Sequence, residues 1–183
     1  RDFATELSRQ GLTITSGMAS GIDSEAHRAA LEAGGFTVAV LGTGADVIYP
    51  ESGRDLAARI AKQGALVSEF PPGTTAKREH FPSRNRIISG LSLGVLVVEA
   101  GLRSGTLITA RLAGEQGREI FAIPGSIHNP MSKGCHRLIR EGARLVENVA
   151  EIQQELAAMA GQLAGDLRRQ LAYEERDARS PTL

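Results

Sequence analysis

Basic and aromatic side chains alternate along residues 70–90, FPPGTTAKREHFPSRNRIISG. The cations of this segment are Lys77, Arg78, Arg84 and Arg86. Glu79 is its only acid, and two phenylalanines and a histidine complete the pattern. Ammonium and guanidinium groups are the usual partners of phosphate, and flat rings are the surfaces on which unstacked bases pack. The composition therefore favours a site for single-stranded nucleic acid, with a solvated charged loop as the alternative.

The end of this segment predicts a helix over residues 83–92, with Arg84 and Arg86 in its first turn. Cations oppose the helix macrodipole there and cost roughly 0.3–1 kcal/mol each. A basic helix start is reasonable if an anion occupies it. We therefore expect Arg84 and Arg86 to point toward a phosphate backbone rather than toward bulk water.

A glycine-rich turn, SGMASGIDSEAH at residues 16–27, follows a predicted strand. Gly17 and Gly21 allow close approach of the backbone, and Asp23 is placed to cap the next helix. Such a turn offers backbone N–H groups and the positive end of a helix to a phosphate. The alternative is a tight turn that needs glycine only for a positive φ. We interpret His27 as a packing or hydrogen-bonding residue.

Another helix start suited to an anion is predicted in EAGLRSGTLITARLAGEQG, residues 99–117. Arg103 adds a positive charge to the turn formed by Ser104, Gly105 and Thr106. Helix capping alone would also account for the serine and the threonine.

Catalytic chemistry is less favoured by the sequence. Glu69 and Glu99 both end predicted strands and could act as general acid and base. The chain has no serine-hydrolase order, zinc-protease motif or P-loop, and its four histidines lack ligand spacing. In LGTGADVIYP, residues 41–50, Val47 stands where a dinucleotide-binding fingerprint needs its third glycine. We therefore expect no catalytic residue, no metal, and no NAD or other cofactor.

The charge of the chain is balanced overall but uneven along its length. Residues 77–144 carry 11 basic and 5 acidic side chains, whereas residues 1–76 carry 6 and 9, and residues 145–183 carry 4 and 7. A net charge of zero therefore does not exclude a nucleic-acid partner, because the middle segment can build a local positive face.

Short apolar runs alternate with helical patterns, as in an α/β fold with a doubly wound, mostly parallel sheet and helices on both faces. Strands are predicted over residues 12–16, 36–42, 64–70, 94–100, 119–125 and 143–146. Helices are predicted over residues 1–10, 23–34, 52–63, 83–92, 105–117 and 132–142. Such sheets bind ligands beyond the carboxyl ends of their strands, where the four loops at residues 16–27, 41–50, 70–90 and 99–117 would meet.

The remaining features concern cellular location and the two ends of the chain. A single cysteine, Cys135, excludes an internal disulfide framework, and no apolar run is long enough to span a membrane. These features favour a cytoplasmic protein. The chain opens on a helix where an α/β domain normally opens on a strand, so we expect the first unit to be truncated. Helical apolar spacing continues as far as Leu171, and this stripe could pack on the domain or on another subunit.

Seven motifs in order resemble the DNA-processing protein A family, DprA or Smf, over residues 11 to about 150. They are GMASGIDSEAH, LGTGADVIYP, SEFPPG, HFPSRNRIISGLS, VVEAGLRSGTLITA, GREIFAIPG and GCHRLIREGA. The resemblance implies an extended Rossmann-like domain that binds single-stranded DNA without a cofactor. It also implies protection of incoming DNA in natural transformation, loading of a RecA-type recombinase, and a homodimer.

Carried over to this chain, the family's DNA site comprises three groups of residues. They are Gly17, Gly21 and Asp23; Arg84, Asn85 and Arg86; and Ser104, Gly105 and Thr106. The late GCHRLIREGA helix and the stripe after it are candidates for subunit or recombinase contact. The family's first strand, with its Gly-Ser-Arg turn, is absent. We therefore expect a DNA-binding domain over residues 1–150 that lacks this strand, and a C-terminal helix with a tail or linker over residues 151–183.

One enzymatic alternative remains, a nucleotide-hydrolysing enzyme. Nucleotide-hydrolysing phosphoribohydrolases of the lysine-decarboxylase-like fold have a PGGxGTxxE motif at the turn that contains Gly105 and Thr106. This chain has Thr109 where the catalytic glutamate of that motif would stand. The substitution disfavours hydrolysis.

Overall fold

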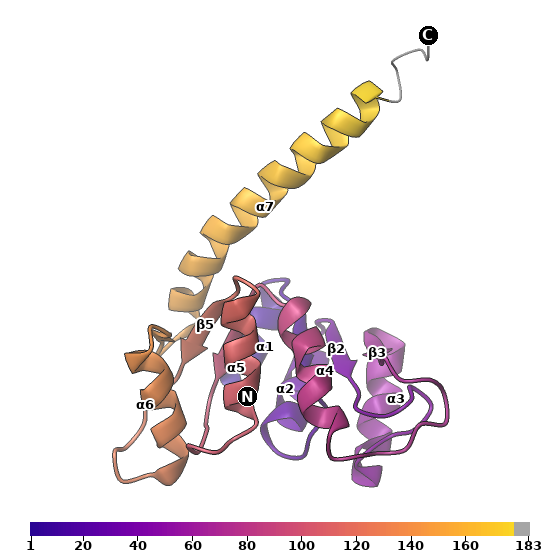
Figure 1. Cartoon of the computed structure of the whole chain (residues 1–183), viewed down its shortest axis with the longest axis vertical. Coiled ribbons are helices and arrows are strands. Elements are labelled where there is room, and N and C mark those ends of the chain that lie inside the picture. Colours follow the sequence, from indigo (N-terminus) through magenta and orange to yellow (C-terminus); the bar gives the residue numbers. More distant parts are fainter. Residues whose placement is uncertain (178–183) are drawn as a thin grey trace.

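The computed structural model describes residues 1–177 and shows helices packed against short parallel strands (Figure 1). The strands are β1 (Ile14–Ser16), β2 (Thr37–Val40), β3 (Ala65–Val67), β4 (Gly94–Val97), β5 (Glu119–Ala122) and β6 (Arg144–Leu145). The helices are α1 (Asp2–Arg9), α2 (Ile22–Glu32), α3 (Arg54–Gln63), α4 (His80–Gly90), α5 (Thr106–Glu115), α6 (Lys133–Arg140) and α7 (Val149–Asp177). Two 3-10 turns, Glu51–Gly53 and Pro130–Ser132, precede α3 and α6.

The strands form two parallel sheets, in the orders β1-β2-β3 and β4-β5-β6. The α/β class predicted from the sequence is confirmed, but within residues 1–177 no backbone pairing joins the sheets into one. Side chains join them instead, because Ile14 of β1 and Leu96 of β4 pack on the same apolar cluster. The chain thus adds β2 and β3 outward from β1, and then returns to the side of β1 to form β4. From β4 it adds β5 and β6 outward in turn. Such a reversal in strand order places a ligand crevice at the carboxyl ends of the strands.

Two further clusters anchor the helices that begin at this edge. Met18, Leu41 and Ile60 are buried between the first sheet and its helices. Val97 and Ala122 are buried with apolar residues of α5 and α6. Each fully buried apolar side chain of this size stabilises the fold by about 1.5–3 kcal/mol, so these clusters hold the strand ends and their loops in place.

Helix α7 begins against the core and then leaves it. Val149 and Ile152 are buried, and Leu156 approaches Gly94 at the amino end of β4. Beyond this point the helix projects from the body of the molecule, away from the loops that precede α4 and α6 (Figure 1). The early part of the apolar stripe therefore packs on the domain, whereas Leu163, Leu167 and Leu171 lie outside the side chains that the structure describes.

Helix α4 differs from its prediction in a way that matters for the site. It begins at His80 rather than at residue 83, which puts Arg84 and Arg86 in its second turn. The placement of these arginines in the first turn was wrong, and the macrodipole argument fails with it. Pro82 is tolerated as the third residue because the first turn needs no intrahelical N–H donors. Contacts of His80 and Phe81 with Gly42, in the loop just after β2, are revealed by no local pattern and fix the actual start.

Candidate nucleic-acid interface

The glycine-rich turn after β1 is held by the carboxylate of Asp23. Its Oδ2 accepts hydrogen bonds from the N–H groups of Gly17 and Ala19, at 3.0 and 3.2 Å. Asp23 is the second residue of α2, and Gly21, with φ of 90°, occupies the N-cap. The expectation that Asp23 caps the helix was therefore wrong, because its side chain turns back to the preceding loop. The carboxylate fixes the shape of the turn.

Arg84 reaches this turn from α4 and is almost entirely buried, with 5% of its surface exposed. Its Nη1 donates to the carbonyl oxygen of Gly17 at 2.7 Å and to that of Val40 at the end of β2. Burial lowers the pKa of the guanidinium, and the charge of Asp23 acts in the opposite direction. The prediction that Arg84 points toward a phosphate backbone was wrong, although the side chain does turn away from bulk water. Its donors meet backbone carbonyls of two neighbouring strand ends.

Arg86, two residues later, is exposed and forms an ion pair with Glu69. Glu69 lies just beyond the end of β3, so the pair crosses from α4 to the neighbouring loop. More than half of the Arg86 side chain is open to solvent. Its guanidinium is therefore accessible to an incoming phosphate, which would compete with the carboxylate of Glu69.

Aromatic rings gather beside these arginines. Phe81 lies with its ring centroid 5.8 Å from Cζ of Arg84 and 5.6 Å from the ring of Tyr49. His80 stacks on Phe70 with centroids 4.1 Å apart and donates from Nδ1 to the carbonyl oxygen of Gly42 at 2.9 Å. Tyr49, which is 52% exposed, is a candidate residue that the sequence did not single out. Its only signal was an aromatic residue in a loop at the carboxyl end of a strand.

Lys77 and Arg78 lie exposed in the loop that precedes α4. The backbone of that loop is tied to the loop after β2, since Gly44 N–H donates to Thr74 O at 2.9 Å and Gly73 N–H donates to the Asp46 carboxylate. These bonds hold the two loops together; Lys77 and Arg78 follow in the first loop, and Tyr49 belongs to the loop after β2. Exposed cations and an exposed ring therefore lie in adjoining loops.

The turn before α5 shares this edge but has its own local hydrogen bonds. Ser104 Oγ accepts from Thr106 N–H at 3.2 Å and donates to Thr106 Oγ1 at 3.0 Å, while Gly105 is the N-cap. Arg103, immediately before it, is exposed. Helices α4 and α5 lie side by side (Figure 1), and Gln116 Nε2 donates to Arg86 O at 3.0 Å. The turn thus flanks the glycine and arginine group without belonging to its hydrogen-bond network.

His27 lies beneath the site and is fully buried. Its Nδ1 is 2.7 Å from Thr37 Oγ1, which donates to Ile14 O at 2.6 Å. The hydroxyl proton is thus committed to the carbonyl, so Nδ1 is the donor in this pair. Burial lowers the pKa of His27 to about 4, assisted by Arg84 and opposed by Asp23. The packing role predicted from the sequence is confirmed.

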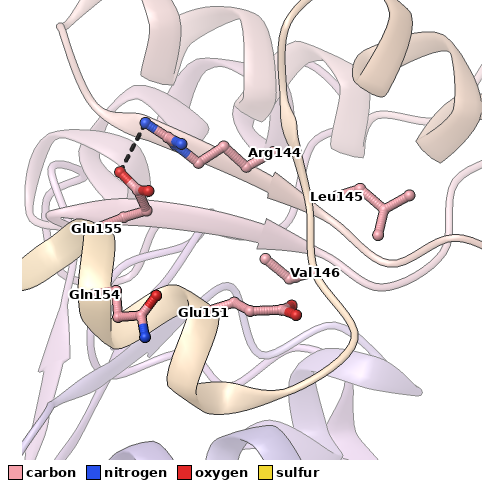
Figure 2. A pocket seen from close by; sticks show the side chains of 6 residues that line it. All are labelled: Arg144, Leu145, Val146, Glu151, Gln154 and Glu155. Atoms are coloured by element: carbon pink, nitrogen blue, oxygen red, sulfur yellow. Dashed lines mark ion pairs between the residues drawn. The ribbon is translucent and has the colours of Figure 1, made fainter.

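Two cavities lie outside this group of basic and aromatic residues. One of about 240 Å³ adjoins the glycine turn and is lined by Gly21, Ser24, Arg28 and the Pro50–Gly53 segment, among others. The larger, about 410 Å³, is an open groove between β6 and the first turns of α7 (Figure 2). The exposed cations and rings above therefore form an open surface rather than an enclosed pocket, which suits a polymeric ligand.

The fold and the site define a parallel α/β protein of the Rossmann-like type with basic and aromatic side chains at the carboxyl edge of its strands. The model of the family "DNA recombination-mediator protein A" matches residues 1–157, and the chain belongs to that family. It is 57% identical to protein Smf of Escherichia coli over 157 residues and 52% identical to DprA of Streptococcus pneumoniae over 144 residues. These alignments cover 85% and 79% of this chain but 42% and 51% of those proteins, so the chain spans about half their length.

Solved structures agree with the family assignment. The crystal structure of S. pneumoniae DprA superposes with a TM-score of 0.76 at 48% identity, covering 85% of this chain and 57% of that one. DprA of Helicobacter pylori, whose structure describes its single-stranded DNA binding mode, gives a TM-score of 0.76 at 29% identity. That superposition covers 88% of this chain and 72% of that one. No helix within residues 1–177 combines the length and apolar character needed to span a membrane.

Proposed function

We propose that this chain binds single-stranded DNA across the carboxyl ends of its strands. The observation that carries the proposal is the exposed Tyr49 ring packed on Phe81, with the exposed cations Lys77, Arg78 and Arg86 in the adjoining loop and helix. Base stacking on a ring and phosphate neutralisation by cations together describe single-strand binding without sequence readout. The exposed rings distinguish such a site from one for duplex DNA, whose bases are already stacked.

The residues proposed to form the site are Gly17, Gly21, Asp23, Lys77, Arg78, Arg84, Asn85, Arg86, Arg103, Ser104, Gly105 and Thr106. The side chains of Lys77, Arg78, Arg86 and Arg103 supply phosphate contacts, and the two turns place the positive ends of the α2 and α5 dipoles at the same edge. Tyr49 and Phe81 are added as stacking surfaces. No cofactor and no catalytic step are needed for this activity.

The decisive experiment is a fluorescence titration of labelled oligothymidine and of a duplex of equal length, each at two salt concentrations. We expect tighter binding to the single strand and an affinity that falls steeply with salt, because phosphate contacts release counterions. Tyr49→Ala should weaken single-strand binding by roughly 1–3 kcal/mol, the usual contribution of one stacked base. The exposed ring of Phe36, which lies at the start of β2, provides the matched control Phe36→Ala.

Equal affinity for the single strand and for the duplex would contradict the proposal, and so would an unchanged single-strand affinity in Tyr49→Ala.

The nucleotide-hydrolysing alternative makes a separate prediction. It requires release of free base from a nucleoside monophosphate, at a rate that Glu99→Gln abolishes. Half-buried Thr109 stands in place of the glutamate which that chemistry needs.

The wider role that we propose is that of a cytoplasmic recombination mediator, which protects incoming single strands and loads a RecA-type recombinase onto them. The family to which the chain belongs supports this role. We also propose a homodimer formed through β6. Among the residues that the structure describes, this strand pairs only with β5, so its outer edge is open there, and Leu145 on it is 47% exposed. Figure 2 shows the groove that β6 forms with α7, where Arg144 pairs with Glu155 at 2.7 Å.

A further inference from the structure

The two arginines of the RNR sequence in α4 have opposite environments. Arg84 is buried and bonded to backbone carbonyls, whereas Arg86 is exposed and bonded only to a carboxylate at the surface. We propose that Arg84 is a positioning residue of the DNA site. It makes no contact with DNA and holds the glycine turn, the end of β2 and the Phe81 ring in the arrangement that binds it. This inference rests on the proposed single-strand binding.

The hydrogen bonds of Arg84 join parts of the chain that are far apart in sequence. Gly17 follows the last residue of β1, and Val40 is the last residue of β2, so one guanidinium bridges two adjacent strand ends. Asp23 holds the N–H groups of the same glycine turn. The turn is therefore fixed on both sides, through its N–H groups by a carboxylate and through its carbonyl by a guanidinium.

Gly17 is shaped to admit this side chain. A methyl group at Gly17 would overlap the guanidinium of Arg84. The φ of Gly17 does not lie in the left-handed region, so it is the close approach of Arg84 that requires glycine here. The Arg84 side chain therefore fits against the turn only because residue 17 has no side chain.

Arg84 also orients the groups that flank it on α4. Its guanidinium faces the ring of Phe81, one turn earlier, and its Nε donates to Asn85 Oδ1 at 3.1 Å. Phe81 in turn packs on Tyr49. With 5% of its surface exposed and its donors directed inward, Arg84 has little surface left for a phosphate. Its effect on DNA must pass through the turn and the rings.

Salt dependence separates a positioning residue from a contact. Each lost phosphate contact should reduce the slope of log affinity against log salt by about 0.7 for single-stranded DNA. We expect Arg84→Lys and the uncharged Arg84→Gln to weaken oligothymidine binding about tenfold or more with the slope unchanged, because no phosphate contact is lost in either variant. Arg86→Gln should reduce the slope by about 0.7. A reduced slope in Arg84→Gln would overturn the inference.

A measurement on the wild-type protein keeps the inference testable if the Arg84 variants fail to fold. In protein labelled with ¹⁵N-arginine, the Nε–H signal of Arg84 should be protected from solvent exchange and should move little as oligothymidine is added. The Arg86 signal should exchange rapidly and shift. Arg84 shifting as much as Arg86 would overturn the inference while leaving single-strand binding intact. Failure of the wild-type protein to bind oligothymidine would instead overturn the proposed function, and this inference with it.

Discussion

Glu69 forms an ion pair with Arg86, and this pair sets a competition at the proposed site. A phosphate that binds Arg86 must first displace the carboxylate. The pair is partly exposed, so its free energy is at most about 1 kcal/mol. We expect Glu69→Gln to tighten oligothymidine binding by roughly two- to fivefold at moderate salt, measured by fluorescence titration.

The matched control for this prediction is Glu115→Gln. It removes one negative charge and breaks the exposed Arg111–Glu115 pair on α5, outside the proposed site. An equal gain in affinity from both variants would mean that net charge, rather than the release of Arg86, is responsible.

The burial of His27 leads to a prediction about the stability of the protein rather than about its binding. Its pKa is lowered to about 4 in the folded protein, while the ordinary value near 6.5 applies to the unfolded chain. Between these values the unfolded chain binds a proton that the folded protein does not, so stability falls as the pH falls. For this residue alone we expect a loss of about 2 kcal/mol between pH 7.5 and pH 5.

The measurement is the urea unfolding free energy of wild type and His27→Gln at both pH values. The variant should lose less stability on acidification, by about the amount assigned to His27, whereas exposed His128→Gln should behave as the wild type does. Parallel pH profiles for wild type and His27→Gln would contradict the burial of a neutral imidazole.

At the scale of the elements, sequence periodicity was a good guide to type and order. Every predicted strand and helix is present, although each strand is shorter than its apolar run. Apolar residues continue beyond the paired segments because the loops at strand ends are also partly buried. The division into two sheets left no sequence signal, since pairing between strands depends on partners distant in the chain.

The site was predicted less completely than the fold, for the same reason. The basic loop, the glycine turn and the turn before α5 were found because local composition marks them. The burial of Arg84 was missed because its partners, Gly17 and Val40, lie 67 and 44 residues away. Tyr49 was missed because its contact with Phe81 is likewise a product of the tertiary fold.

The contact between Gly17 and α4 can be tested by adding one methyl group. In Gly17→Ala the new Cβ would overlap the Arg84 guanidinium. Because overpacking costs about 1–3 kcal/mol, we expect the urea unfolding free energy to fall by that amount. Single-strand affinity should fall with it, since the turn and α4 must move apart.

The control is Gly114→Ala within α5, where the new methyl group would meet Ile120 Cδ1 at an ordinary 3.5 Å. Alanine is the better helix former, so this variant should be as stable as wild type or more stable, by up to about 1 kcal/mol. Unchanged stability in Gly17→Ala would show that the close approach of Arg84 to the turn is not tight.

At the scale of the whole molecule, the proposed functions occupy separate surfaces. The loops that precede α4 and α5 carry the cations and rings of the proposed DNA site. In the second sheet β4 forms one edge and β6 the other. The outer edge of β6 and the groove beside α7 therefore lie at the edge opposite β4. A dimer through β6 would therefore leave both DNA sites open.

The open edge of β6 provides the last prediction. Two copies related by a two-fold axis can pair their β6 edges as antiparallel strands, which would extend each three-stranded sheet across the interface. Leu145 would then be buried between the subunits. Leu145→Lys would bury an unpaired ammonium group there, which costs far more than the 1.4 kcal/mol that corresponds to a tenfold weaker dimer.

We expect light scattering after size exclusion to show a dimer for wild type and a monomer for this variant, with single-strand binding per monomer retained. Leu91→Lys, an equally exposed leucine at the end of α4, should remain dimeric. A dimeric Leu145→Lys protein would mean that the subunits meet at another surface. A monomeric wild type would mean that the proposed dimer does not form.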